Sequence, residues 1–428
     1  MLTVTFTADD VVYSFKKIMD PKVDCPHLKV YYQDIEKVTK IDDYTVQFKY
    51  KRPYFLALEF CGGMPIVPKH VFDDGGDFNK HPAGRAPIGT GPYVFISWDT
   101  NRAIIVRKNE NYWKKTPEIK EILFKIIQDQ TVALQVLKKG DMDVMGLRQI
   151  QWARQTESDK FNSMFQKLEY YTPGFSYIGW NLRRPYFKDK RVRQALTMLI
   201  DRQKILDKLY FGLGQIVTGQ FFIFSPDYSP NIKPWAYDPE AAKALLTEAG
   251  WTDHDGDGVR DKDGVPFSFD FLVSAGGRAR INFATILKED LKGAGIEVKI
   301  KQLEWSSFLK NLHDRDFDAT TLGWAMGVEN DPYQLWHSSQ IDAGSNYIGY
   351  SNKEIDQIIE EARVEFNPKK REVLYHKFNG ILHDEQPYTF LYCLASLVVV
   401  DRRFENVIAY PLGLDPREWR ICESISNP

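Results

Sequence analysis

The sequence predicts an α/β fold built on an open, mostly parallel β-sheet. Strand-like and helix-like runs alternate in the second half of the chain. These runs are 267–273, 281–291, 297–303, 305–313 and 317–324, of which the first, third and fifth are strand-like. Two helical crossovers in fewer than 60 residues favour neighbouring strands that run in the same direction. The composition fits a folded protein, with 43% hydrophobic and 27% charged residues.

Length and charge limit the number of domains and the kinds of partner that the protein can have. At roughly 150 residues per domain, 428 residues predict two to three domains. The 56 basic and 58 acidic side chains give a net charge of -2, which argues against a nucleic-acid partner. The apolar runs at 221–224 and 394–400 are far shorter than the roughly 18 residues of a membrane-spanning helix. Aromatic residues make up 14% of the chain and are its one compositional excess.

The first half begins with a helix and two hairpins. Thr7 is placed to cap a helix that ends before Pro21. The alternating pattern at 37–50 predicts a hairpin, and strands at 93–97 and 103–108 predict another. A strand at 122–127, a helix at 131–139 and a strand at 143–145 follow in β–α–β order, which predicts that the two strands form a parallel pair.

The second half adds longer elements. An aromatic-rich strand is expected at 175–181, and one long helix at 189–210. Asp238-Pro239 starts another helix, which Gly250 ends. Two helices are then expected near 355–366 and 368–386, and a single long apolar strand at 388–400.

The four cysteines are Cys25, Cys61, Cys393 and Cys422. None has C-x-x-C spacing, so zinc-site and thioredoxin-like chemistry have no support. Two alternatives remain: disulfides that pair Cys25 with Cys61 and Cys393 with Cys422, or four unpaired buried thiols.

Enzyme signatures are missing from the sequence. It contains no G-x-S-x-G, H-E-x-x-H, G-x-x-x-x-G-K-[ST] or G-x-G-x-x-G motif, and its eight histidines are scattered. A catalytic triad that assembles only in space leaves no such trace. The sequence therefore favours a protein without catalysis.

An acidic loop carries the spacing of a calcium ligand set. Aspartates occupy positions 1, 3, 5 and 9 of a twelve-residue loop, with Gly258 at position 6: Asp253, Asp255, Asp257 and Asp261. This is how an EF-hand loop begins. Position 12, however, is Gly264 rather than Glu, and a strand rather than a helix is expected next. The loop is either a structural calcium site or a solvated turn.

Aromatic and polar residues gather near the predicted strand ends. Ligands of open α/β sheets bind beyond the carboxyl ends of strands, where Trp and Tyr offer flat apolar walls with a polar tip. The candidate ligand-binding residues are Tyr177, Trp180, Asn181, Gly323, Trp324, Met326, Gly327, Asp331, Tyr333, Trp336, Asn346 and Tyr347. The alternative is that about half of them pack in the core, as is expected of residues 221–224.

Five segments together resemble a known family. They are TADDVVYSF at 7–15, PIGTGPY at 87–93, RKNENYW at 107–113, KRVRQAL at 190–196, and Gly250-Trp251 with the acidic loop. In this order they resemble the family 5 extracellular solute-binding proteins, the dipeptide- and oligopeptide-binding receptors of ABC importers. The similarity extends over nearly the whole chain.

The resemblance implies a two-lobed α/β fold of the periplasmic-binding-protein type, class II, with hinge strands and a ligand held between the lobes. It implies that 1–86 is the remainder of the N-terminal subdomain of lobe 1, 87–173 the rest of lobe 1, 174–387 lobe 2, and 388–428 a return to lobe 1. Family members begin further upstream, with a signal peptide and an additional section of lobe 1. An incomplete first lobe is therefore expected.

One departure from the family concerns the ligand. Peptide-binding members carry an Asp soon after the Gly-Trp pair that here is Gly323-Trp324, and it pairs with the peptide amino terminus. Met326-Gly327 occupies that place, while Glu329 and Asp331 are displaced along the chain. A buried ammonium without a carboxylate costs several kcal/mol. Sugars, metal chelates and hydrophobic compounds, which other family members bind, therefore remain alternatives to a peptide.

The expected function is that of the substrate-binding receptor of a bacterial ABC importer, in the periplasm or outside the cell envelope. The expected ligand is a small organic molecule, most simply a peptide, and the expected partners are a membrane permease and its ATPase. No cofactor is required apart from a possible structural calcium ion, and a monomer is expected. The alternatives are an α/β hydrolase and a sensory or structural cell-surface binding protein without transport.

Overall fold

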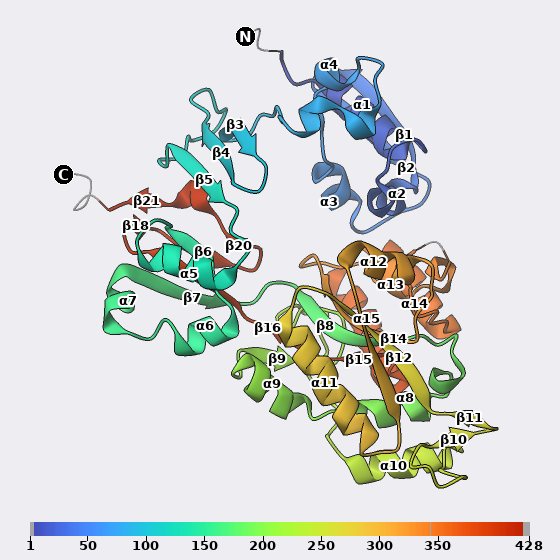
Figure 1. Ribbon diagram of the computed structural model, residues 1–428. Coiled ribbons are helices and arrows are strands. Elements are labelled where there is room, and N and C mark those ends of the chain that lie inside the picture. Colours follow the sequence, from blue (N-terminus) through green and yellow to red (C-terminus); the bar gives the residue numbers. More distant parts are fainter. Residues whose placement is uncertain (1–3, 343, 423–428) are drawn as a thin grey trace. The chain divides into compact units, whose positions relative to one another are not determined.

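The computed structural model describes residues 4–342 and 344–422, and the chain divides into two compact units (Figure 1). Unit 1 comprises Met1–Leu147, Thr156–Leu168 and Leu397–Pro428. Unit 2 comprises Arg148–Gln155 and Glu169–Ser396. The chain thus leaves unit 1, forms unit 2 and returns to unit 1. The lobe boundaries expected from the family stay a prediction.

The predicted N-terminal helix and first hairpin are confirmed in unit 1. α1 (Ala8–Met19) begins at Thr7, whose hydroxyl accepts a hydrogen bond from the Asp9 N–H, while the Asp10 carboxylate accepts one from the Thr7 N–H. This reciprocal capping satisfies N–H groups that the first helical turn leaves without partners. β1 (Ile35–Asp42) and β2 (Thr45–Tyr50) pair antiparallel. α2 (Pro26–Tyr32) lies between α1 and β1, and α3 (Ala57–Gly62) and α4 (Lys69–Phe72) follow β2.

The predicted parallel pair in unit 1 is wrong. β5 (Glu121–Lys125) joins the antiparallel hairpin of β3 (Tyr93–Asp99) and β4 (Ala103–Lys108). After α5 (Gln130–Lys138), β6 (Val144–Gly146) enters a different sheet of order β6-β17-β7. The β–α–β order is present, but the two strands find partners elsewhere in the sequence. β7 is Phe165–Tyr170, and the helices before it are α6 (Gln149–Arg154) and α7 (Asp159–Met164).

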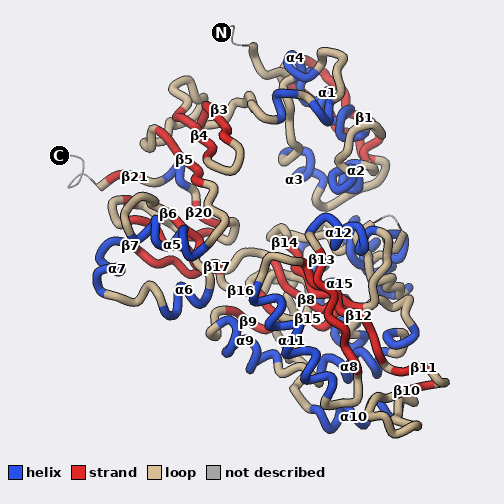
Figure 2. The backbone as a smooth tube through the Cα atoms, viewed as in Figure 1, coloured by secondary structure: helices blue, strands red, loops and turns tan. Residues whose placement is uncertain are grey.

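A five-stranded sheet forms the centre of unit 2 (Figure 2). Its order is β13-β12-β14-β8-β15, built from β13 (Glu297–Leu303), β12 (Ser268–Ser274), β14 (Ala319–Ala325), β8 (Gly174–Trp180) and β15 (Tyr388–Phe390). β12 runs parallel to β13 and β14, as the crossover pattern predicts. β8 runs antiparallel to both of its neighbours, so the sheet is mixed and the expectation of a mostly parallel sheet is wrong.

Helices cover both faces of this sheet. Alternate strand residues point to opposite faces, so Phe271 packs with the helices α8 (Lys190–Met198), α10 (Pro239–Glu248) and α11 (Arg278–Lys292). Its neighbour Leu272 packs with α12 (Trp305–His313), α14 (Lys353–Val364) and α15 (Pro368–Glu385). Two separate apolar cores result, one on each face.

The single helix expected at 189–210 is two helices, α8 (Lys190–Met198) and α9 (Arg202–Tyr210). Asp201 lies at the break, and its carboxylate accepts a hydrogen bond from the Lys204 N–H at 2.9 Å. An N-capping residue has a non-helical backbone, so the second helix begins afresh there. The apolar periodicity continues across the break, which is why the sequence alone indicates one helix.

The long strand expected at 388–400 is three short ones. β15 pairs with β8, β16 (Tyr392–Leu394) with β9 (Gly214–Ile216), and β17 (Ser396–Asp401) with β6. An unbroken apolar run fits strands that are buried on both faces, but it contains no mark of a change of partner. The remaining short elements are α13 (Tyr333–Trp336), β10 (Asp261–Lys262), β11 (Val265–Pro266), β18 (Phe404–Glu405), β19 (Ala409–Tyr410), β20 (Gly413–Leu414) and β21 (Arg420–Ile421).

All four cysteines lie among the described residues and are thiols rather than disulfides. Cys25 and Cys393 are buried, whereas Cys61 and Cys422 are only partly so. Burial raises the pKa of the Cys393 thiol to about 11. Within residues 4–342 and 344–422, no helix combines the length and apolar character that a membrane crossing requires.

Candidate ligand-binding surface of unit 2

Four aromatic rings form a column across the middle of the unit 2 sheet. Tyr388 stacks on Tyr177 with ring centroids 3.9 Å apart, and Tyr177 lies parallel to Trp324 at 6.3 Å. Trp324 in turn lies nearly parallel to Tyr347 at 6.1 Å. We call these four residues the aromatic column. Its inner rings, Tyr388 and Tyr177, are buried, and its outer rings, Trp324 and Tyr347, are half-buried. The outer pair is therefore the part that a ligand can reach.

Burial also decides the chemistry of the inner rings. It raises the pKa of the Tyr177 and Tyr388 hydroxyls well above the usual value for tyrosine. Both phenols are therefore neutral at physiological pH. The column is a neutral, largely apolar wall rather than a source of protons.

The end of β14 combines this wall with exposed backbone. Gly323 and Gly327 are exposed, and Trp324 and Met326 between them are half-buried. The Met326 N–H bonds the Pro173 carbonyl at 3.0 Å, which fixes the chain where it leaves the sheet. A Cβ at Gly327 would lie 2.7 Å from the Glu329 carbonyl oxygen, so the turn requires a glycine there. Flat rings flanked by exposed glycine backbone suit an organic ligand with polar backbone atoms.

Asp331 is not available to a ligand. Its Oδ2 lies 2.9 Å from the Arg363 Nε, and the two side chains are only 4% and 6% exposed. Its Oδ1 accepts the Tyr333 N–H at 3.0 Å. Glu329 also has an arginine partner, with its Oε2 3.3 Å from Arg371, but its side chain remains 55% exposed. Of the Asp331 and Glu329 carboxylates, only that of Glu329 is therefore accessible.

Trp180 lies away from the column, and Asn181, the next residue, is fully buried and donates its amide to the Phe317 carbonyl at 2.6 Å. Trp180 sits opposite Ala319 and Phe175 opposite Trp324, because β8 runs antiparallel to β14. Trp180 is therefore about 16 Å along the sheet from Trp324, at about 3.3 Å per residue. It also points to the opposite face, into the core of α8 and α11. It is fully buried there, and its indole N–H donates to Thr389 Oγ1 at 3.1 Å.

Two more of the sequence candidates are fully buried near the column. Trp336 packs on Tyr388 with ring centroids 4.7 Å apart and donates its indole N–H to the Gln220 side-chain oxygen. Asn346 donates to the Tyr350 carbonyl at 2.8 Å and accepts the Tyr350 N–H at 3.0 Å. Both side chains use their polar groups inside unit 2. The prediction that they contact a ligand stays a prediction.

Tyr333 is half-buried between two charged or polar groups. Its ring stacks on His337 at 4.5 Å and lies 4.2 Å from the Arg363 guanidinium. Its hydroxyl is 2.9 Å from Ser339 Oγ. The ring is thus held in place by the same arginine that holds Asp331.

Sequence reasoning missed an exposed aromatic side chain in unit 2. Phe224 ends an apolar run expected in the core, and its neighbours Phe221 and Phe222 are buried there. Phe224 itself is 65% exposed and meets the Tyr171 ring edge-on at 5.8 Å. Tyr171 lies two residues before Pro173, whose carbonyl accepts the hydrogen bond from the Met326 N–H. Nothing in an unbroken apolar run reveals which member faces out.

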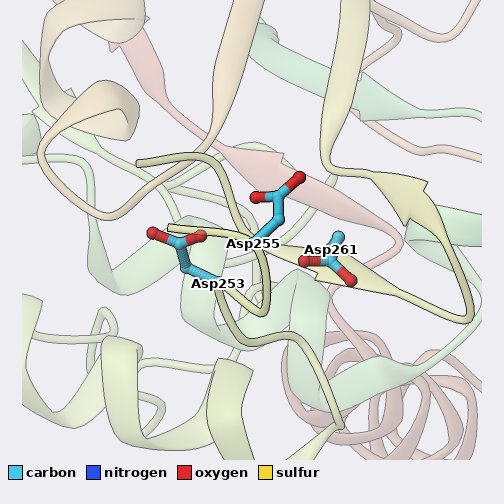
Figure 3. Close-up of side chains that lie close together, drawn as sticks. All are labelled: Asp253, Asp255 and Asp261. Carbon is cyan, nitrogen blue, oxygen red and sulfur yellow. The ribbon is translucent and has the colours of Figure 1, made fainter. Parts of the chain in front are cut away.

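The acidic loop forms a separate cluster, shown in Figure 3. Asp253, Asp255 and Asp261 each offer a carboxylate oxygen, and these oxygens lie within 4.8 Å of one another. Asp257 is not in the group, and its Oδ1 accepts the Val259 N–H at 2.7 Å. Three hard oxygen donors on a flexible turn fit calcium, although six or more ligands are usual. β10 begins inside the loop, at Asp261, and after the loop come β11 and then β12, so strands rather than a helix follow, as the sequence predicts.

Hydrogen bonds within the loop explain its shape without an ion. Asp253 accepts the Gly256 and Gly258 N–H groups at 2.8 and 3.0 Å. Asp261 accepts the His254 N–H at 2.9 Å, which is the main reason that the pKa of its carboxyl is lowered. The loop is therefore formed by Asx-type turns, and its carboxylates already accept hydrogen bonds from main-chain N–H groups.

Comparisons with known proteins support the family resemblance. The sequence model of the bacterial extracellular solute-binding proteins, family 5 Middle, matches residues 3–346. The oligopeptide-binding protein AppA of Bacillus subtilis (strain 168) is 33% identical over 420 residues, which cover 95% of this chain and 75% of that protein.

Solved structures agree in fold. The structure of Bacillus subtilis AppA in complex with a nonapeptide matches with a TM-score of 0.86 and 30% identity, over 97% of this chain and 84% of that chain. The structure of NikZ from Campylobacter jejuni in complex with Ni(L-His) matches with a TM-score of 0.84 and 25% identity, over 97% and 84% of the two chains. The two-domain α/β architecture expected from the sequence is thereby confirmed. The chain belongs to the bacterial extracellular solute-binding proteins of family 5.

Proposed function

We propose that this protein is the substrate-binding receptor of a bacterial ABC importer and that its ligand is a peptide or a peptide-like solute. The observation that carries the proposal is the pairing of the half-buried rings Trp324 and Tyr347 with the exposed backbone at the end of β14. Support also comes from AppA, which shares 33% of its residues and whose structure holds a nonapeptide.

The proposed binding chemistry uses two kinds of contact. The outer rings of the aromatic column pack against apolar parts of the ligand, where a buried ring contributes strongly to affinity. Exposed main-chain groups around Gly323 and Gly327 exchange hydrogen bonds with the ligand backbone. Main-chain bonds do not depend on side-chain identity, so this wall suits ligands of varied sequence.

The amino terminus of the ligand plays a smaller part in this proposal than in relatives with a free aspartate. Asp331 is held by Arg363 and the Tyr333 N–H, so its carboxylate is already paired. Glu329 is the exposed carboxylate nearest in sequence, and its partner Arg371 competes for it. The aromatic rings and the exposed backbone therefore provide more of the ligand affinity than they do in those relatives.

The test is calorimetry of the whole protein with a peptide library, followed by ring substitutions. Trp324→Ala should weaken the best peptide by roughly 2 kcal/mol, about thirtyfold. Trp305→Ala is the matched control, because Trp305 is also a half-exposed tryptophan of unit 2 but stacks on Phe308 of its own helix. Mass spectrometry should recover the bound peptide uncleaved. Absence of binding to any peptide, or equal effects of the two substitutions, would overturn the proposal.

The proposed partners follow from the receptor role. A membrane permease and its ATPase receive the solute, and the protein acts as a monomer in the periplasm or outside the cell envelope. The family description, extracellular solute-binding proteins, supports this location. Transport of the identified peptide by a reconstituted permease, with and without this protein, tests the partnership, and light scattering tests the monomer.

For the acidic loop we propose a structural calcium ion that plays no part in ligand binding. Asp253, Asp255 and Asp261 supply three oxygens close enough to share one ion. The loop lacks a carboxylate at position 12, where Gly264 stands, so the expected affinity is low.

A further inference from the structure

Tyr347, the outermost ring of the aromatic column, lies on a loop without regular structure. The loop follows a 3-10 turn at Ser338–Gln340 and leads to α14. We call residues 341–342 and 344–349 the Tyr347 segment. A ring on such a loop has no helix or sheet to fix it, so other contacts must hold it for a defined ligand wall to exist.

Arg315 provides three of these contacts and bonds α12 with a fourth. Its guanidinium donates to the carbonyl of Leu312 at the end of α12 and to three carbonyls of the Tyr347 segment, at 2.7–3.2 Å: Ile341, Asp342 and Gly344. The planar group with its five N–H donors suits such divergent bonding. One side chain thus joins α12 to the segment at several points.

Arg183 holds the same segment from the strand β8 side. Its guanidinium donates to the Tyr347 carbonyl at 3.0 Å and to the Ile341 carbonyl at 3.2 Å. A Cβ at Gly349 would lie 2.7 Å from the Arg183 Nη1, and Gly349 has a φ of +72°. The positive φ favours glycine at 349, and any side chain there would also push the Arg183 guanidinium aside. The two arginines share the Ile341 carbonyl, so they act on one piece of backbone.

Arg315 follows the C-terminus of α12. Its φ is +61°, in the left-handed region, and the Asp316 N–H donates to the Asn311 carbonyl at 2.9 Å, as is common at helix C-termini. The Arg315 side chain therefore starts from a fixed point of the backbone. Its hydrogen bonds come from a charged donor, and such bonds are stronger than neutral ones.

Arg315 also touches the ring itself. Its guanidinium carbon lies 4.9 Å from the centre of the Tyr347 ring, within the range of a cation–π contact. The same ring lies 6.1 Å from Trp324 and nearly parallel to it. Displacing the guanidinium would therefore free both the backbone and the face of Tyr347.

Two asparagines predicted as ligand contacts belong to this support. Asn181 donates its amide to the Arg315 and Phe317 carbonyls at 3.2 and 2.6 Å and accepts the Arg183 N–H at 3.2 Å. It thus fixes the main chain of both arginines. Asn346, inside the segment, closes the turn by its paired bonds to Tyr350.

We infer that Arg183 and Arg315 are positioning residues of the ligand-binding surface: by clamping the Tyr347 segment, they fix the outer ring of the aromatic column in the orientation that a ligand meets. The inference rests on the proposed function, because it assigns a role in that same surface. It concerns orientation rather than direct contact, since the guanidinium groups are occupied by carbonyls.

The experiment is a double-mutant cycle in the full-length protein. Arg315→Ala should weaken the best peptide at least tenfold by calorimetry, and Tyr347→Ala should weaken it similarly. If the arginine acts through the ring, Arg315→Ala should add less than a twofold loss in the Tyr347→Ala background. Arg184→Ala is the matched control: Arg184 pairs with Asp318 at 2.7 Å and should change affinity less than twofold.

Hydrogen exchange separates this inference from the proposed function. Without any ligand, Arg315→Ala should speed amide exchange in residues 344–349 at least tenfold, whereas Arg184→Ala should not. Absence of peptide binding by the unaltered protein would refute the proposed function but leave this readout intact. Unchanged exchange, or losses that multiply in the double variant, would overturn the inference. Should Arg315→Ala fail to fold, Arg183→Met in the same cycle tests the same clamp.

Discussion

The ion pair of Asp331 and Arg363 allows a sharp test of how unit 2 is held together. Both side chains are at least 94% buried, and their atoms lie 2.9 Å apart. Arg363→Met would leave the carboxylate buried without its cation, which costs about 3–5 kcal/mol. It would also remove the cation that lies 4.2 Å from the Tyr333 ring, a contact of about 1 kcal/mol. We therefore expect the free energy of unfolding to fall by about 4–6 kcal/mol.

A second substitution isolates the buried charge as the cause. In Asp331→Asn/Arg363→Met both charges are gone, while the Asn side-chain oxygen can still accept the Tyr333 N–H. The double variant should regain at least about 2 kcal/mol over Arg363→Met, since burial of unpaired charge is then relieved. Urea unfolding followed by tryptophan fluorescence measures each change.

The control is an exposed ion pair in the same unit. Lys377 lies 2.7 Å from Glu354, and both side chains are more than half exposed. Lys377→Met should cost less than about 1 kcal/mol. If Arg363→Met costs no more than Lys377→Met, or if the double variant is no more stable than Arg363→Met alone, the reasoning from burial is refuted.

Three further predictions concern pH, ligand charge and calcium. Burial lowers the pKa of His383 to about 4 from 6.5, so the unfolded chain takes up a proton that the folded one resists. The free energy of unfolding should therefore fall by about 1–2 kcal/mol from pH 7 to pH 5, and His383→Gln should flatten this dependence in urea titrations; an equally steep dependence in that variant would contradict the role of His383. Acetylation of a peptide's amino terminus should weaken calorimetric binding less than about tenfold (1.4 kcal/mol), and a hundredfold loss would point to a carboxylate anchor, with Glu329 the first candidate. A calcium chelator should lower the melting temperature of the unaltered protein but not of Asp255→Asn, and an equal response of both would exclude calcium from this loop.

Local periodicity made much of the fold predictable. The runs that became β12, α11, β13, α12 and β14 each carry their own pattern, and the short connections leave little choice of topology. Helix starts were equally visible, because the capping residues Thr7 and Asp238 accept hydrogen bonds within their own first turns. Elements whose stabilising contacts are local are the ones that a single sequence predicts.

Pairing partners were not predictable in the same way. β5 and β6 stand in β–α–β order but belong to different sheets. The run 388–400 serves three sheets in turn, since each piece is apolar enough for any of them. Strand partners are chosen by contacts far apart in sequence, which leave no periodic trace.

The direction of one strand explains how the candidate surface differs from its sequence prediction. Tyr177 and Trp180 are three residues apart, so in a strand they face opposite sides, and only Tyr177 reaches the column. The antiparallel course of β8 then places Trp180 at the far end from Trp324. Aromatic excess therefore serves two purposes in unit 2: rings on one face and end of the sheet remain accessible, and the others fill its cores.

The partners of charged residues are still harder to predict from the sequence. Asp331 lies close in sequence to Trp324 and looks available, yet its partner Arg363 is 32 residues further along and closes it off. Arg183 and Arg315 look like surface residues but direct their charge onto carbonyls around Tyr347. In each case an arginine side chain bonds a main-chain carbonyl or a carboxylate that is distant from it in the sequence. The polar residues around this candidate surface thus act mainly to hold its rings.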